Sequence, residues 1–138
     1  MLATMKTDST AKPYAIIDRS CKPLIYVTFT GQRETPENFE NYLNELHRNY
    51  DDKAPIGLIF DAENAPTPNI AYQKLQAQWM QTHFNLIQQY CQGVAYIMPN
   101  PFLRPVLKMI FAIQRSPAPF RVFSNKEAGV KWLKGRCQ

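Results

Sequence analysis

The residues best suited to binding or chemistry gather in one short segment, just after an apolar run at 56–60. Carboxylates, amides and one hydroxyl alternate there with two prolines, and the polar members are Asp61, Glu63, Asn64, Thr67 and Asn69. Asp, Asn and Thr also form turns and loop caps without any further role. The segment is therefore interpreted either as an ordinary loop or as the rim of a binding site.

The rest of the sequence offers no catalytic or metal-binding pattern. The five glycines form no G-x-G motif, which excludes a phosphate-binding loop of the nucleotide-hydrolysing type. His47 and His83 belong to different predicted helices and lack the H-x-x-x-H spacing of a zinc site. We therefore expect no catalytic residues, no metal, no cofactor and no enzymatic activity.

Cysteine usage and hydropathy bear on the cellular compartment. Cys21, Cys91 and Cys137 are odd in number and include no C-x-x-C pair, so we expect reduced thiols rather than a disulfide framework. The first twelve residues lack the apolar stretch of a signal peptide, and no apolar run is long enough for a transmembrane segment. These observations predict a soluble, cytoplasmic protein.

Two periodicities divide the chain into strands and helices. Alternating or continuous apolar runs predict strands at 14–19, 24–30, 56–60, 93–98 and 120–123. Apolar residues at three- and four-residue spacing predict helices at 36–50, 70–91 and 102–114, and a last helix after position 124. Thr35 before Pro36 is a predicted N-cap, and Ser124 with Glu127 forms a predicted capping box.

The predicted order of elements is β-β-α-β-α-β-α-β-α, after a polar tail at 1–13 that we expect to be disordered. The short connection at 20–23 favours an antiparallel hairpin of the first two strands. Right-handed crossovers through helices make the later strands parallel. The sequence thus predicts one α/β domain at 14–138, with a mixed, mostly parallel five-stranded sheet and four helices.

Charge is divided unevenly along the chain. Residues 1–69 contain 7 Lys/Arg and 10 Asp/Glu, whereas residues 70–138 contain 9 Lys/Arg and a single acid, Glu127. The basic half either presents a face to an anionic partner or is neutralised by the acids of the first half. Because it lacks the interleaved aromatic and basic residues of a single-strand binder, nucleic acid is not the expected partner.

The predicted helix at 70–91 carries almost no charge, because glutamines supply its polar side. Aromatic residues in a charge-depleted surface are typical of protein interfaces. Tyr72, Trp79 and Tyr90 are the candidate anchors, and they predict a homodimer. The alternative is an ordinary neutral helix surface.

Four segments carry a further pattern: LIYVTFTG in the hairpin, the central IGLIFDAENAPTP, the stretch GVAYIMPNPFLRPVLKMIF, and the terminal PFRVFSNKEAGVKWL. Together they resemble the STAS-like domains, in particular bacterial proteins related to anti-sigma-factor antagonists and to Sec14-type lipid-binding modules. The resemblance spans roughly residues 14–134. It implies a non-enzymatic regulatory module that binds a protein partner, with a Sec14-like binder of a small apolar ligand or lipid as the alternative.

The resemblance also implies a role for the loop after the central strand. In the antagonist family, a partner kinase phosphorylates a serine or threonine at this place, and Thr67 is the one hydroxyl in the matching loop. A phosphate adds about two negative charges, which helix N-termini favour. Since parallel strands end at the same edge of a sheet, we expect Arg33 at this rim, paired with Asp61 or with a bound anion.

Overall fold

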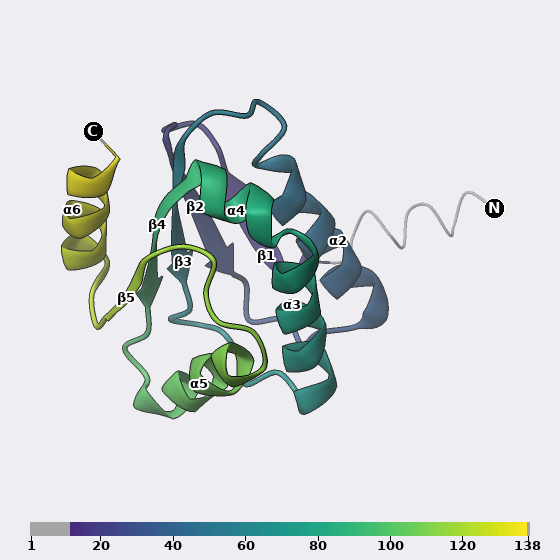
Figure 1. Cartoon of the computed structure of the whole chain (residues 1–138). Helices are drawn as coiled ribbons and strands as arrows, with labels where there is room; N and C mark the ends of the chain where they lie inside the picture. The colour runs from purple at the N-terminus through teal and green to yellow at the C-terminus, as the bar shows by residue number, and fades with distance from the viewer. Residues whose placement is uncertain (1–11, 138) are drawn as a thin grey trace, which may run out of the picture.

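The structure, a computed structural model, describes residues 12–137, so most of the predicted tail at 1–13 lies outside the described residues. One sheet contains five strands in sequence order: β1 (Ala15–Asp18), β2 (Leu24–Phe29), β3 (Ile56–Asp61), β4 (Cys91–Ile97) and β5 (Phe120–Phe123) (Figure 1). β1 is antiparallel to β2, and all other neighbours are parallel. The predicted mixed, mostly parallel sheet is confirmed.

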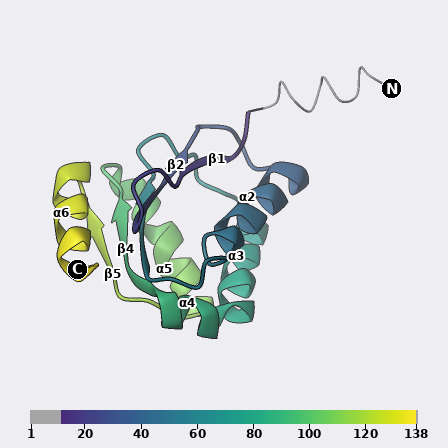
Figure 2. The ribbon, with the colours of Figure 1, turned by 90° about the horizontal axis from the view of Figure 1, so that it is seen from above.

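The helices cover both faces of the sheet. They are α2 (Pro36–Arg48), α3 (Ile70–Thr82), α4 (Phe84–Tyr90), α5 (Arg104–Ile113) and α6 (Lys126–Arg136), and a 3₁₀ turn at Pro101–Leu103 precedes α5. Figure 2 shows α6 on one side of the sheet and the other four helices on the opposite side. The described residues thus form five α-helices rather than the predicted four.

The extra helix arises because the predicted helix at 70–91 is broken at His83. The backbone angles of His83, φ −107° and ψ 22°, are not helical, and α4 begins at the next residue. A break at one residue barely disturbs the spacing of apolar side chains, and no proline or glycine marks it. Cys91, predicted as the last residue of this helix, is instead the first residue of β4.

The two predicted helix caps have different outcomes. Thr35 caps α2 as predicted: its Oγ1 accepts a hydrogen bond from Asn38 N at 3.1 Å, and Asn38 Oδ1 accepts one from Thr35 N at 2.8 Å. The prediction of Ser124 as the N-cap is wrong, because the N-cap of α6 is the next residue, Asn125. Asn125 Oδ1 accepts from Ala128 N at 2.9 Å, while Ser124 Oγ accepts from Arg104 Nη2 at 3.3 Å.

The face covered by α6 holds a small, tight core. Leu133 is fully buried there against Ile59 and Ala95, which are also fully buried. Gly129 allows α6 to pack closely on the sheet, because a Cβ at this position would lie 2.5 Å from Ile97 Cδ1. The cavity described below lies on the opposite face of the sheet.

Because the strands lie in sequence order, the uneven distribution of charge along the sequence becomes an uneven distribution across the sheet. The acidic first half supplies β1, β2, α2 and β3, and the basic second half supplies β4, α5, β5 and α6 beyond them. The two halves meet at β3, where Lys126 Nζ lies 3.9 Å from Asp61 Oδ2. No helix in the described part of the chain has the length and apolar character needed to cross a membrane.

Candidate functional site

Three aromatic rings form a row across the face of the sheet opposite α6. Phe29, Phe60 and Tyr96 come from β2, β3 and β4, three neighbouring strands. The Phe29 and Phe60 rings stack with centroids 6.1 Å apart, and the Phe60 and Tyr96 rings stack at 5.3 Å with an interplanar angle of 20°. This row of stacked rings, called the aromatic floor below, presents an apolar surface to the helices.

A cavity of about 100 Å³ lies over the aromatic floor. Its walls come from α2, α3 and α5, and the loop between β3 and α3 contributes Ala65, Pro66 and Pro68. Aliphatic, aromatic and proline side chains dominate the lining, and its polar groups are the tyrosines and two glutamines. The lining residues are Tyr14, Phe29, Phe39, Tyr42, Phe60, Ala62, Ala65, Pro66, Pro68, Tyr72, Gln73, Gln76, Met80, Tyr96, Met98, Leu103, Val106, Leu107, Ile110 and Phe111.

Three of the lining tyrosines have perturbed hydroxyls. Burial, with a smaller contribution from Glu34, raises the pKa of Tyr14 to about 12. Burial also raises the pKa values of Tyr42 and Tyr96 well above that of an ordinary phenol. Because low-dielectric surroundings disfavour the phenolate, all three groups remain neutral hydroxyls near pH 7, able to donate and accept hydrogen bonds.

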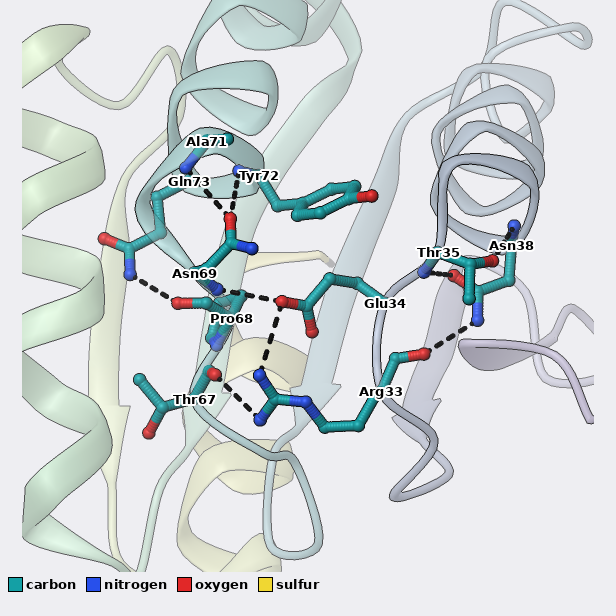
Figure 3. A network of polar contacts seen from close by, with 10 residues as sticks. All are labelled: Arg33, Glu34, Thr35, Asn38, Thr67, Pro68, Asn69, Ala71, Tyr72 and Gln73. Atoms are coloured by element: carbon teal, nitrogen blue, oxygen red, sulfur yellow. Dashed lines mark hydrogen bonds and ion pairs between the residues drawn. The ribbon is translucent and has the colours of Figure 1, made fainter.

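The loop over the cavity is held by the segment that precedes α2 (Figure 3). Arg33 Nη1 donates to the carbonyl oxygen of Thr67 at 3.2 Å, and Arg33 Nη2 lies 3.6 Å from Glu34 Oε2. The same Glu34 oxygen accepts a hydrogen bond from Asn69 N at 2.9 Å. Arg33 therefore lies at the predicted edge of the sheet, beside Thr67 and Glu34 rather than Asp61.

The N-terminus of α3 is already satisfied by this network. Asn69 Oδ1 accepts from Ala71 N at 3.1 Å and from Tyr72 N at 3.4 Å, while the Glu34 carboxylate binds the N–H of Asn69 itself. An anion at this helix end would have to displace both side chains. Thr67 has an exposed side chain, and Arg33 binds the carbonyl oxygen of this residue rather than its hydroxyl.

The remaining predicted rim residues lie further from the cavity. Asp61 ends β3; its Oδ1 accepts from Glu63 N at 3.1 Å, and its other oxygen faces Lys126. Glu63 and Asn64 are exposed on the loop. Asp61 therefore stabilises a turn and joins β3 to α6, which is the ordinary loop role considered in the sequence analysis.

The candidate interface residues of α3 and α4 pack inward. Tyr72, Trp79 and Tyr90 are half-buried against the main core, and the Tyr72 ring contacts Phe39 with centroids 5.0 Å apart. Leu75, in the second turn of α3, points outward and has 43% of its surface exposed. The homodimer through this helix stays a prediction.

The two histidines meet, although His47 lies in α2 and His83 lies at the break between α3 and α4. The rings of His47 and His83 stack with centroids 4.3 Å apart. Among residues 12–137 no cluster of three or more His, Cys, Asp or Glu side chains has the arrangement of a metal site. Cys21 is exposed, Cys91 is buried and Cys137 is half-buried, and all three are free thiols.

Sequence reasoning missed the two features that define this site. The aromatic floor was hidden because Phe29, Phe60 and Tyr96 lie in different strands and meet only through the register of the sheet. Glu34 is not among the residues predicted at the rim, yet only 2% of its side chain is exposed, and its Oε1 has no partner among the described residues. The signal available was its position directly after Arg33, in the loop that follows β2.

Comparisons with known proteins identify the fold. No sequence profile of a known protein family matches the chain, and no curated protein matches it. Among solved structures, the chain is similar to an uncharacterised protein of the DUF3478 family from Shewanella loihica PV-4, described as having a SpoIIAA-like fold. The TM-score is 0.62 at 18% identity, over 86% of this chain and 91% of the other. The chain therefore has the SpoIIAA-like fold, the fold of STAS domains and anti-sigma-factor antagonists.

Proposed function

We propose that this domain is a non-enzymatic binding module that takes a small apolar ligand into the cavity over the aromatic floor. The observation that carries the proposal is the cavity itself, about 100 Å³ in volume with an almost wholly apolar lining. The pocket is partly open to solvent, so its apolar lining meets water when no ligand is bound. A ligand that fills the space would remove this apolar surface from water and would gain dispersion contacts with the lining.

The volume of the cavity, about 100 Å³, suits a single ring or a short alkyl segment. An engineered apolar cavity of about 150 Å³ is known to bind benzene, so a cavity of about 100 Å³ is close to the lower limit for a ring. Met80 and Met98 line it, and unbranched methionine side chains adapt easily to the shape of a guest. A long lipid chain would enter only by its end.

Toluene is a direct probe of this proposal. We expect it to perturb the amide resonances of cavity-lining residues in a saturable way and to raise the melting temperature, because it binds only the folded state. Ala65→Phe, at the loop over the cavity, should abolish both effects. Ala112→Phe, at an exposed position of α5, is the matched control and should preserve them. Absence of saturable binding to the unmodified protein would refute the proposal.

A second candidate function is regulatory binding of a protein partner at the rim, controlled by phosphorylation of Thr67. The observation that favours it is that a guanidinium binds the backbone of the residue that carries the exposed hydroxyl: Arg33 Nη1 donates to the Thr67 carbonyl oxygen at 3.2 Å. A phosphate on Thr67 would gain charge-assisted hydrogen bonds from Arg33 and would change the charge of the rim. A cytoplasmic location, consistent with three free thiols, is part of this second proposal.

Capture experiments with Thr67→Ala and Thr67→Glu test the second candidate. A regulatory partner should bind the unmodified protein and Thr67→Ala alike and bind Thr67→Glu differently, with circular dichroism showing that the fold is retained. Thr82→Glu, at an exposed threonine of α3, controls for added charge. Equal capture by all four proteins would remove Thr67 from consideration.

A further inference from the structure

The face of α5 that is turned away from the core combines exposed apolar side chains with unpaired cations. Its exposed residues are called the α5 surface below, and they are Phe102, Arg104, Pro105, Lys108, Met109 and Ile113. We propose that this surface attaches the domain to a membrane rich in anionic lipids. The proposal does not depend on a ligand in the cavity, because none of these residues lines the cavity.

A second apolar stripe runs along the outside of α5. Leu107 and Ile110 are buried and hold the inner side of the helix in the fold. Pro105, Met109 and Ile113 follow one another at four-residue spacing, so they share a different side of the helix, and all three are exposed. A helix at the surface of a protein normally carries polar residues on its outer side. An apolar stripe at this place therefore indicates a surface that is covered by a partner.

Phe102 extends the stripe at the start of the helix. It lies in the 3₁₀ turn at Pro101–Leu103, three residues before Pro105. Of its surface 81% is exposed, more than for any other large apolar side chain in the described part of the chain. In Figure 1, α5 lies at the bottom of the fold, and no other described element lies below it. The ring can therefore enter the headgroup region of a bilayer without a change in the fold.

The cations beside the stripe have no carboxylate partner. Arg104 and Lys108, four residues apart, are exposed on the flank of the stripe, and Arg115 follows the end of the helix. None of the ion pairs in the described part of the chain includes any of these three side chains. Between Glu63 and Glu127 the sequence contains six Lys/Arg and no acid. The complementary partner of this surface is therefore anionic.

A lipid bilayer fits this combination better than other anionic partners. A nucleic acid duplex offers phosphates to the cations, but it has no apolar layer to receive Met109 and Ile113. In a bilayer, anionic headgroups attract Lys and Arg, and the boundary of the acyl chains beneath them receives the apolar side chains. Each Lys or Arg near an anionic leaflet strengthens binding by about 5-fold. The few cations of the α5 surface therefore predict reversible attachment.

Sedimentation with lipid vesicles tests the proposal on the unmodified protein. Vesicles with equal amounts of phosphatidylcholine and phosphatidylserine should carry the protein into the pellet, whereas vesicles of phosphatidylcholine alone should bind it much more weakly. Binding should weaken as the concentration of NaCl rises, because salt screens the attraction between the cations and the headgroups. Equal binding to both kinds of vesicle, or no binding to the anionic ones, would overturn the proposal.

Matched variants then locate the attachment surface. Phe102→Ala should weaken binding to the anionic vesicles by about 10-fold, and Lys108→Gln by about 5-fold. The controls are Ile16→Ala, at an exposed position of β1, and Lys131→Gln, at an exposed position of α6. Both should leave binding nearly unchanged, and circular dichroism should show the same fold in all four variants. If the controls weaken binding as much as the α5 variants, general charge or hydrophobicity causes it and the proposal fails.

A second copy of the chain is the competing occupant of the α5 surface. Light scattering of the unmodified protein and of Phe102→Ala measures self-association in the absence of lipid. We expect the two proteins to have the same mass. A dimer that Phe102→Ala dissociates, together with no binding to anionic vesicles, would identify the surface as a protein interface and overturn the proposal.

Discussion

The carboxylate of Glu34 accepts a hydrogen bond from the backbone N–H of Asn69, with 2.9 Å between Oε2 and N, and thereby joins the segment before α2 to the start of α3. Only 2% of the Glu34 side chain is exposed, so the bond forms largely out of water. Hydrogen bonds to buried charged groups contribute more than neutral ones. This contact fixes the loop that covers the cavity.

Removing this carboxylate should therefore destabilise the domain. We expect Glu34→Ala to lower the free energy of unfolding by about 1–3 kcal/mol, because the Asn69 N–H loses its acceptor. Glu34→Gln keeps one oxygen in place and should cost less. Urea denaturation of the three proteins measures the difference. Equal midpoints for Glu34→Ala and the unmodified protein would show that the loop is held in another way.

The correct N-cap of α6 gives a second prediction. Asn125→Ala should cost about 0.5–2 kcal/mol, because the N–H of Ala128 loses the side-chain oxygen that accepts its hydrogen bond. Ser124→Ala is the matched control and should have a small effect, since the Ser124 hydroxyl accepts a hydrogen bond from Arg104 Nη2 at 3.3 Å and does not cap α6. Denaturation midpoints of the two variants decide the matter, and a larger loss for Ser124→Ala would contradict the observed cap.

The fold was predictable because its signals are local. The apolar run at 56–60 and the alternation in 24–30 correspond to strands buried on one or both faces, and Thr35 with Pro36 correctly marks the start of α2. The break at His83 was not predictable, because it changes backbone angles without changing the apolar pattern. The shift from Ser124 to Asn125 is equally invisible, since both residue types are good caps.

The candidate site was predictable only in part. The edge of the sheet where Arg33 and Thr67 meet follows from parallel topology, which places the ends of successive strands side by side. The cavity does not follow from it, because the contact between Phe60 and Tyr96 depends on their exact pairing across β3 and β4. A difference of one residue in that pairing would turn one of the rings to the opposite face.

Thiol reactivity provides a third prediction. Burial raises the pKa of the Cys91 thiol to about 12, and the thiolate is the reactive form. Iodoacetamide at about pH 8 should therefore modify the exposed Cys21 quickly, and Cys91 only when the protein unfolds. Mass spectrometry of digested samples, taken with and without urea, identifies the modified sites. Modification of Cys91 at the rate of Cys21 in the folded protein would contradict its burial in β4.

The stacked histidines give the last prediction, which concerns acid stability. Burial, and then the neighbouring His47, lower the pKa of His83 below its ordinary value of 6.5. The folded domain therefore holds His83 neutral at pH values where the unfolded chain is already protonated. Because stability decreases with falling pH wherever the unfolded state binds more protons, the domain should lose stability as the pH falls through about 6.5, until the folded-state pKa is passed.

Carboxylates contribute to acid unfolding as well, so the histidine contribution is measured by comparing variants. Urea midpoints at about pH 7.5 and about pH 5.5 bracket the titration of an ordinary histidine. We expect the loss between these conditions to be smaller in His83→Gln, which has no group to protonate there, and also in His47→Gln, which removes the neighbouring charge at 4.3 Å between ring centroids. Were both variants to lose as much stability as the unmodified protein, the contact between the rings would have no part in the acid response of the domain.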